Sequence, residues 1–167
     1  MKFRIVQEFG APADELCAAL VDPDYLATLG SLPGIGAPVM TAQELRGSVV
    51  SYELRYAFTG QLPAAVTRVV DPSRLTWAER TSVDLAGRRA SFAMVPDHYA
   101  TFFRCEGSWS LNERRPGTTE RTIEGDLRVS APVPLVGGTV ERAIVSGLRE
   151  RLAREPAGFA RWRAARA

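Results

Sequence analysis

Apolar and polar residues alternate over much of the chain, and this two-residue period predicts strands with one buried face. The first strand is expected over residues 2–9, where Phe3, Ile5 and Phe9 share a face with Gln7. Residues 38–46 predict a less regular strand. The clearest strand follows it, and its apolar face consists of Val50, Tyr52, Leu54, Tyr56 and Phe58.

Four more strands are expected from Arg74 onward, separated by turns at residues 86–87, 96–97 and 115–117. Their predicted inward faces consist of Leu75, Trp77, Glu79 and Thr81, of Ala90, Phe92 and Met94, of Phe103, Cys105, Gly107 and Trp109, and of Ile123, Gly125, Leu127 and Val129. An antiparallel meander is the simplest connection. Residues 61–70 fit either a helical turn or a strand, and we favour a short helix.

Two short helices are expected after the first strand. Pro12 at a first helical position, followed by acidic residues, favours the first helix. Asp22 as the N-cap and Pro23 as the first helical residue favour the second. Glycines and prolines predict a loop over residues 30–38.

The period changes to that of a helix after Pro134. The predicted apolar stripe advances in four-residue steps and consists of Val140, Ile144, Leu148 and Leu152. The arginines Arg142, Arg149 and Arg151 lie off this stripe. Gly137 and Gly138 are expected to form a tight turn before the helix. Pro156 cannot donate to the carbonyl of Leu152, so a kink or break is expected there.

This order of elements resembles the START-like superfamily, also called the polyketide cyclase, SRPBCC or birch-pollen-allergen-like proteins. The segments that carry the resemblance are FRIVQEFGAPADELCAALVDPDYL, DPSRLTWAER and APVPLVGGTVERAIVSGLRE. They also look similar to an uncharacterised actinobacterial branch. The resemblance implies an α+β helix-grip fold, with a curved antiparallel sheet of about seven strands (β-α-α-β6-α) wrapped on a long C-terminal helix. It also implies a cavity between the sheet and that helix for lipids, polyketides or similar molecules.

Composition narrows the classes of function. The chain has 167 residues, of which 46% are hydrophobic, so we expect one domain over residues 1–167. A formal net charge of +2 disfavours a nucleic-acid partner. Polar residues interrupt the first ten positions, so we expect no signal peptide and a cytoplasmic protein. Seven arginines against three glutamates from Glu141 onward are interpreted as a solvated helix face, which disfavours membrane contact.

Aromatic side chains gather on the predicted inward faces. We therefore expect an apolar ligand site, with no cofactor, lined by Tyr52, Tyr56, Trp77, Glu79, Phe92, Phe103, Trp109, Ile144 and Leu148. Glu79 is the catalytic candidate, because burial beside Trp77 would raise its pKa and suit it to acid–base work. The other interpretation, which we favour, places Glu79 near the sheet edge or cavity mouth, where its carboxylate is solvated or paired with an arginine such as Arg104.

The remaining reactive residue types predict no catalytic set. His98, the only histidine, is expected in a surface turn. Cys17 and Cys105 lack the spacing of a metal or redox motif, and we interpret them as buried, reduced thiols. The sequence predicts no metal site.

Three hypotheses follow from these features. The first is a carrier or sensor of a small hydrophobic molecule. The second is a small-molecule enzyme of polyketide cyclase or aromatase type. The third is an interaction domain with a filled core. Convergent polar groups around a ligand would distinguish the enzyme from the carrier, whereas the interaction domain requires no cavity.

Overall fold

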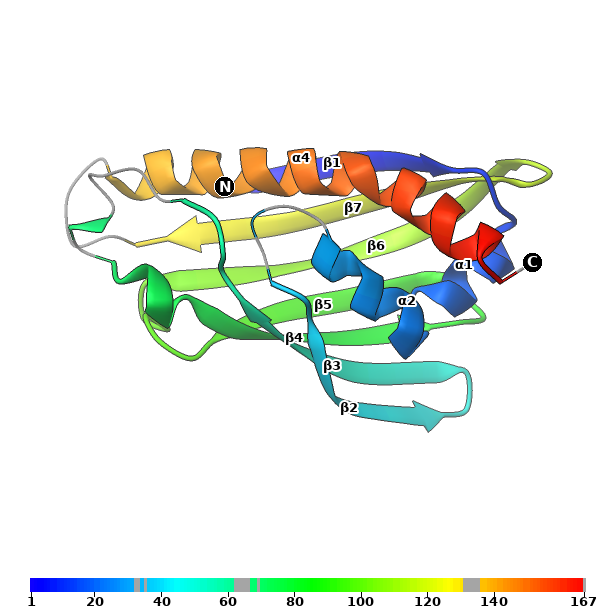
Figure 1. The fold of residues 1–167 in the computed structure, drawn as a ribbon, viewed down its shortest axis with the longest axis horizontal. Coiled ribbons are helices and arrows are strands. Elements are labelled where there is room, and N and C mark those ends of the chain that lie inside the picture. The colour runs from blue at the N-terminus through cyan, green and yellow to red at the C-terminus, as the bar shows by residue number, and fades with distance from the viewer. Residues whose placement is uncertain (32–33, 35, 62–66, 69, 131–135, 167) are drawn as a thin grey trace.

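The computed structural model describes all residues except 32–33, 35, 62–66, 69, 131–135 and 167. Within this part of the chain, one antiparallel sheet of seven strands has the order β1-β7-β6-β5-β4-β3-β2 (Figure 1). The strands are β1 (Lys2–Phe9), β2 (Val39–Arg46), β3 (Val49–Ala57), β4 (Thr76–Asp84), β5 (Arg89–Pro96), β6 (Phe103–Arg115) and β7 (Thr118–Val129). The expected meander and the α+β helix-grip architecture are confirmed.

The helices are α1 (Ala13–Ala19), α2 (Pro23–Thr28) and α4 (Val136–Ala164), with 3-10 turns η1 (Leu29–Ser31) and η2 (Pro72–Arg74). Figure 1 shows α4 running along β1 and β7, with α1 and α2 near its C-terminal end. We call the sheet face that carries the buried core the inner face, and the opposite face the outer face. No helix within the described ranges has both the length and the apolar character needed to cross a bilayer.

The two short helices begin as local sequence dictates. Asp22 is the N-cap of α2, its side chain accepts a hydrogen bond of 2.8 Å from the backbone N–H of Asp24, and Pro23 is the first helical residue, as expected. In α1, however, Pro12 is the N-cap and Ala13 begins the helix, so the predicted start was one residue early. An error of one residue is ordinary at a helix end, where capping residues are half helical.

The register places the predicted inward residues together. Phe3 lies opposite Gly125, and Phe92 lies opposite Gly107, all on the inner face. A Cβ atom at Gly125 would come within 2.4 Å of the Phe3 ring, and one at Gly107 within 2.6 Å of the Phe92 ring. Strands β7 and β6 therefore carry glycine where an aromatic ring from the adjacent strand lies over the backbone.

The terminal helix differs from its prediction in three ways. It continues through Pro156 to Ala164, although Figure 1 shows its last turns bending toward α1 and α2. The expected break is therefore wrong. Gly137 and Gly138 lie inside the first turn of α4, so the expected tight turn at these glycines is also wrong.

The third difference is the buried face of α4. Ile144 is 38% exposed, whereas Val145 and Phe159 are buried and Leu148 and Leu152 are half-buried. Steps of four residues rotate around a helix by about 40° each, so a stripe built only from such steps leaves the contact face. The observed stripe mixes steps of three and four, and the prediction was wrong at Ile144.

The helix predicted within residues 61–70 falls largely outside the described residues. Elsewhere the turns agree with the prediction. The β6–β7 connection contains Gly117 with φ of 74°, a conformation that glycine adopts without strain.

Candidate ligand-binding site

Aromatic side chains line the inner face, as the strand period predicted. Tyr52, Tyr56 and Trp109 are buried. Three further predicted site aromatics are half-buried and pack against the core: Trp77, Phe92 and Phe103. The structure therefore brings together the predicted strand residues of the site. Their contact with a ligand stays a prediction.

Glu79 lies on the inner face of β4, opposite Leu54 of β3. Burial raises its pKa, and a hydrogen bond of 3.2 Å from the Thr81 hydroxyl only partly opposes that effect. The alternative partner, Arg104, instead contacts Glu106 at 2.9 Å, so the proposed pairing with Glu79 was wrong. Glu79 as a residue is half-buried, and burial is the largest influence on its pKa.

Two tyrosines border Glu79. Burial, and then the negative charge of Glu79, raise the pKa of both Tyr52 and Tyr56. The Tyr56 ring stacks on Trp77 with a centroid distance of 5.5 Å and an interplanar angle of 16°. Both phenols therefore stay protonated and can serve as hydrogen-bond donors or acceptors at neutral pH.

Arg151 of α4 approaches this group from the helix side. Its guanidinium carbon lies 5.9 Å from the Tyr56 ring centroid, and Nη2 donates to the Leu29 carbonyl over 3.3 Å. The residue is only 6% exposed, and its Nη1 has no hydrogen-bond partner among the described residues. We placed Arg151 off the apolar stripe, in solvent; it is instead a buried cation beside the aromatic wall.

Trp77 carries a second unpartnered donor. Its indole Nε1 is buried and lacks a hydrogen-bond partner in the described part of the chain. Buried N–H groups are normally paired, and both of these unpartnered donors belong to side chains that contact the Tyr56 ring.

A neighbouring polar cluster is, by contrast, well paired. Arg121 donates to Glu155 through Nη2 and to the Gln7 carboxamide oxygen over 2.7 Å. Tyr25 donates to the other oxygen of Glu155 over 3.1 Å. All four side chains are buried. Because each group has partners within the protein, this cluster fastens α4 to the sheet rather than offering a binding site.

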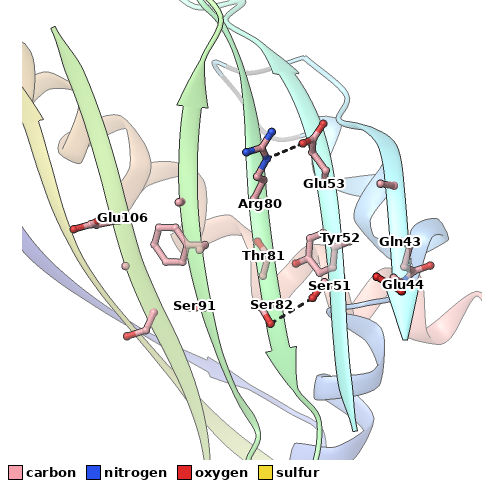
Figure 2. A pocket seen from close by; sticks show the side chains of 15 residues that line it. Gln43, Glu44, Ser51, Tyr52, Glu53, Arg80, Thr81, Ser82, Ser91 and Glu106 are labelled. Atoms are coloured by element: carbon pink, nitrogen blue, oxygen red, sulfur yellow. Dashed lines mark hydrogen bonds and ion pairs between the residues drawn. The ribbon is translucent and has the colours of Figure 1, made fainter. Parts of the chain in front are cut away.

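A groove of about 710 Å³ lies on the outer face of the sheet (Figure 2). Four serines in register form its floor, namely Ser51, Ser82, Ser91 and Ser108. Figure 2 shows longer side chains beside this row, including Glu53, which accepts a hydrogen bond of 2.9 Å from Arg80. The groove forms because short side chains lie between long ones. It is on the opposite face of the sheet from the predicted cavity.

Histidine and cysteine add no reactive group to the polar cluster of the inner face. His98 is exposed and lies within hydrogen-bond distance, 3.2 Å, of Arg74, in the turn where it was expected. Cys17 and Cys105 are buried and free, as predicted, and burial raises the pKa of Cys105 to about 12. Over the described residues, no group of three or more histidine, cysteine or acidic side chains could hold a metal ion.

A family match covers residues 4–162, and the family is described as "Protein of unknown function (DUF2505)". The chain belongs to this family. No curated protein matches it. The comparison therefore assigns the chain to a family without assigning it an activity.

Solved structures share its fold at low sequence identity. The Zhui aromatase/cyclase from Streptomyces sp. R1128 has 19% identity, a TM-score of 0.63 and coverage of 99% of this chain and 97% of its own. The di-domain ARO/CYC BexL from the BE-7585A biosynthetic pathway has 18% identity and a TM-score of 0.66 over 96% of this chain and 46% of its own. Thalictrum flavum norcoclaurine synthase, in complex with a transition state analogue, has 16% identity and a TM-score of 0.51, covering 91% and 93%. These likenesses agree with the predicted fold; the actinobacterial branch stays a prediction.

Sequence reasoning missed the polar groups that α4 contributes. Glu155 follows Leu152 by three residues and precedes Phe159 by four, so it falls within the buried stripe. A charge at such a position, together with Gln7 and Arg121 at inward strand positions, was the available signal. No local pattern marks Arg151, whose burial depends on Leu29 and Tyr56 from distant elements.

Proposed function

We propose that this protein binds a small hydrophobic molecule between the inner face of the sheet and α4. The observation that carries the proposal is the partial exposure of the inward side chains on β4 to β6. Trp77, Phe92, Met94 and Phe103 point to the core side, yet each keeps part of its surface exposed. An apolar wall that the protein covers incompletely is suited to an apolar ligand.

The position of α4 explains this incomplete cover. The helix packs on β1 and β7, at one side of the sheet. The inner surfaces of β3 to β5 consequently lack its full cover, and Arg151 reaches toward them from the side. Because sheet and helix form one packed unit, we also propose that residues 1–167 form one domain.

The names of the fold neighbours agree with such a role. Two are aromatase/cyclases and one is a synthase in complex with a transition state analogue, so this fold accommodates small organic molecules in those proteins. The likeness concerns the fold, and the ligand of this chain is a separate question.

Thermal shift measurements test the proposal directly. A ligand at about a hundredfold excess over its dissociation constant should stabilise the fold by roughly 2.7 kcal/mol. For a domain of this size that corresponds to a rise in Tm of about 5 to 11 °C. Fatty acids, sterols, flavonoids and aromatic polyketides form the screen.

A pair of variants then locates the ligand. Leu148→Trp adds bulk from a half-buried position of α4, whereas Ile144→Trp adds the same bulk at an exposed one. We expect the first to abolish the shift and the second to preserve it. If no compound raises Tm and the inner face is filled, the interaction-domain hypothesis replaces the carrier.

One observation favours an enzyme as the second candidate. Glu79 is a carboxyl with a raised pKa, beside two protonated tyrosines on an apolar wall, which suits a general acid or base. Conversion of a bound polyketide-type substrate by the wild type, and its loss in Glu79→Gln with binding retained, would support catalysis. Binding without conversion in both proteins would support a carrier.

A further inference from the structure

Arg151 is a buried cation that forms no ion pair in the described part of the chain. None of the ion pairs within 4.0 Å there includes this residue, although it is 6% exposed. Its one hydrogen bond joins Nη2 to a neutral carbonyl, that of Leu29. Burying a cation is unfavourable unless an opposite charge compensates it, so a negative group beside the guanidinium would stabilise it.

The neighbouring carboxylates of the described residues form no ion pair with Arg151. Glu155 is engaged by Arg121 in a buried ion pair and also accepts hydrogen bonds from Gln7 and Tyr25. Glu79 influences Arg151 through space, yet the two form no ion pair. Burial has the largest effect on the pKa of Glu79 and raises it, while the charge of Arg151 acts in the opposite direction.

A second donor lies in the same part of the inner face. The Tyr56 ring contacts the indole of Trp77 and the guanidinium of Arg151, and each of these groups carries one buried N–H without a described partner. A carboxylate has two oxygens that accept hydrogen bonds, and it supplies the missing negative charge. A neutral hydroxyl or carbonyl would accept a hydrogen bond and leave the charge of Arg151 uncompensated.

We infer that the ligand is an amphipathic carboxylic acid, whose apolar body lies on the aromatic wall and whose carboxylate binds Arg151 Nη1 and Trp77 Nε1. This inference rests on the proposed function and adds the chemical class of the ligand. It makes Arg151 and Trp77 the residues that select an acid over a neutral molecule with the same body.

Matched pairs of probes test the inference. We would titrate the full chain at about pH 8, where carboxylic acids are ionised, with decanoate and decanol, and with naphthoate and naphthol, by calorimetry. The two members of each pair share one apolar body. We expect the acid to bind at least about tenfold more tightly than the alcohol, the usual size of a charge-assisted hydrogen bond.

Three variants assign the preference to residues. Arg151→Met keeps an unbranched apolar stem and removes the charge, and Trp77→Phe keeps a ring on Tyr56 and removes the N–H. We expect Trp77→Phe to lower the affinity for the acid at least about threefold and Arg151→Met about tenfold. The affinity for the alcohol should be nearly unchanged in both variants. Arg154→Met is the matched control, because Arg154 is exposed and pairs with Glu150. It should leave both affinities as in the wild type.

The outcomes separate the two proposals. Equal binding of acid and alcohol by the wild type overturns the carboxylate inference and leaves the binding of apolar molecules standing. Unchanged acid affinity in Arg151→Met also overturns it. Absence of binding by all four probes overturns the inference, and absence of any hit in the wider apolar screen overturns the proposed function as well. If Arg151→Met does not fold, Trp77→Phe and the wild-type ratio of affinities decide.

Discussion

The side-chain amide of Gln7 donates a hydrogen bond of 2.6 Å to the carbonyl oxygen of Leu152 in α4. Four residues later stands Pro156, which has no N–H to offer that carbonyl. A side chain of β1 therefore replaces the missing helical hydrogen bond. This explains how α4 continues through a proline and why its position is tied to the first strand.

A double-mutant cycle can measure this replacement. Gln7→Met should lower the free energy of unfolding by at least about 2 kcal/mol, because it leaves buried polar groups without a partner. In a Pro156→Ala background the cost should be smaller by about 1 kcal/mol, since the alanine N–H can then bond the Leu152 carbonyl. Urea unfolding of the four proteins gives both values. Equal costs in the two backgrounds would contradict the interpretation. Gln43→Met is the control, because Gln43 also donates to a backbone carbonyl, that of Val21, but is exposed.

Truncation of two tryptophans should distinguish a packed wall from an open one. Trp109 is buried, so Trp109→Ala is expected to cost about 3 to 5 kcal/mol. Trp77 is half-buried and borders the proposed ligand space, so Trp77→Ala should cost less than about 3 kcal/mol. Chemical denaturation measures both costs. Similar losses from the two positions would indicate that Trp77 is as tightly packed as Trp109.

The raised pKa of Glu79 predicts a pH dependence of stability. In the folded state this carboxyl binds its proton more tightly than in the unfolded chain, where the ordinary value is 4.5. Its protonated form thus favours folding below pH 4.5, and that contribution is lost as the pH rises toward the folded-state pKa.

Substitution of Glu79 isolates this contribution. Glu79→Gln stays neutral, so its stability relative to the wild type should rise as the pH increases from about 4 to 8. The measurement is urea unfolding at several pH values. A constant difference across this range would show that the Glu79 pKa is the same in the folded and unfolded states. Glu44→Gln, at an exposed position of β2, serves as the control.

Both thiols should be protected in the native protein. Burial raises the pKa of Cys17 and raises that of Cys105 to about 12, so the thiolate is scarce at pH 8. We expect Ellman's reagent to label neither cysteine rapidly before unfolding and both after unfolding in guanidinium chloride. Rapid labelling of one thiol in the native state would place that cysteine in an accessible environment.

The strands were predictable because a two-residue period and turn residues are local properties. β3 illustrates this, since its buried residues are Val50, Tyr52, Leu54 and Tyr56, as its alternation indicated. The terminal helix was predictable as a helix, yet its buried face was not. Ile144 and Val145 are adjacent apolar residues, and only packing on β1 and β7 decides which of them is covered.

The order of amino acids is enough to predict which residues share a strand face, because side chains alternate along any extended backbone. It therefore placed Tyr56, Trp77 and Glu79 on the inner face. The folded chain was needed to show that Arg151 lies beside them and that Gln7 replaces the hydrogen bond missing at Pro156. Those contacts link positions far apart in the chain, and a buried charge or an unpaired N–H is defined by what surrounds it in space.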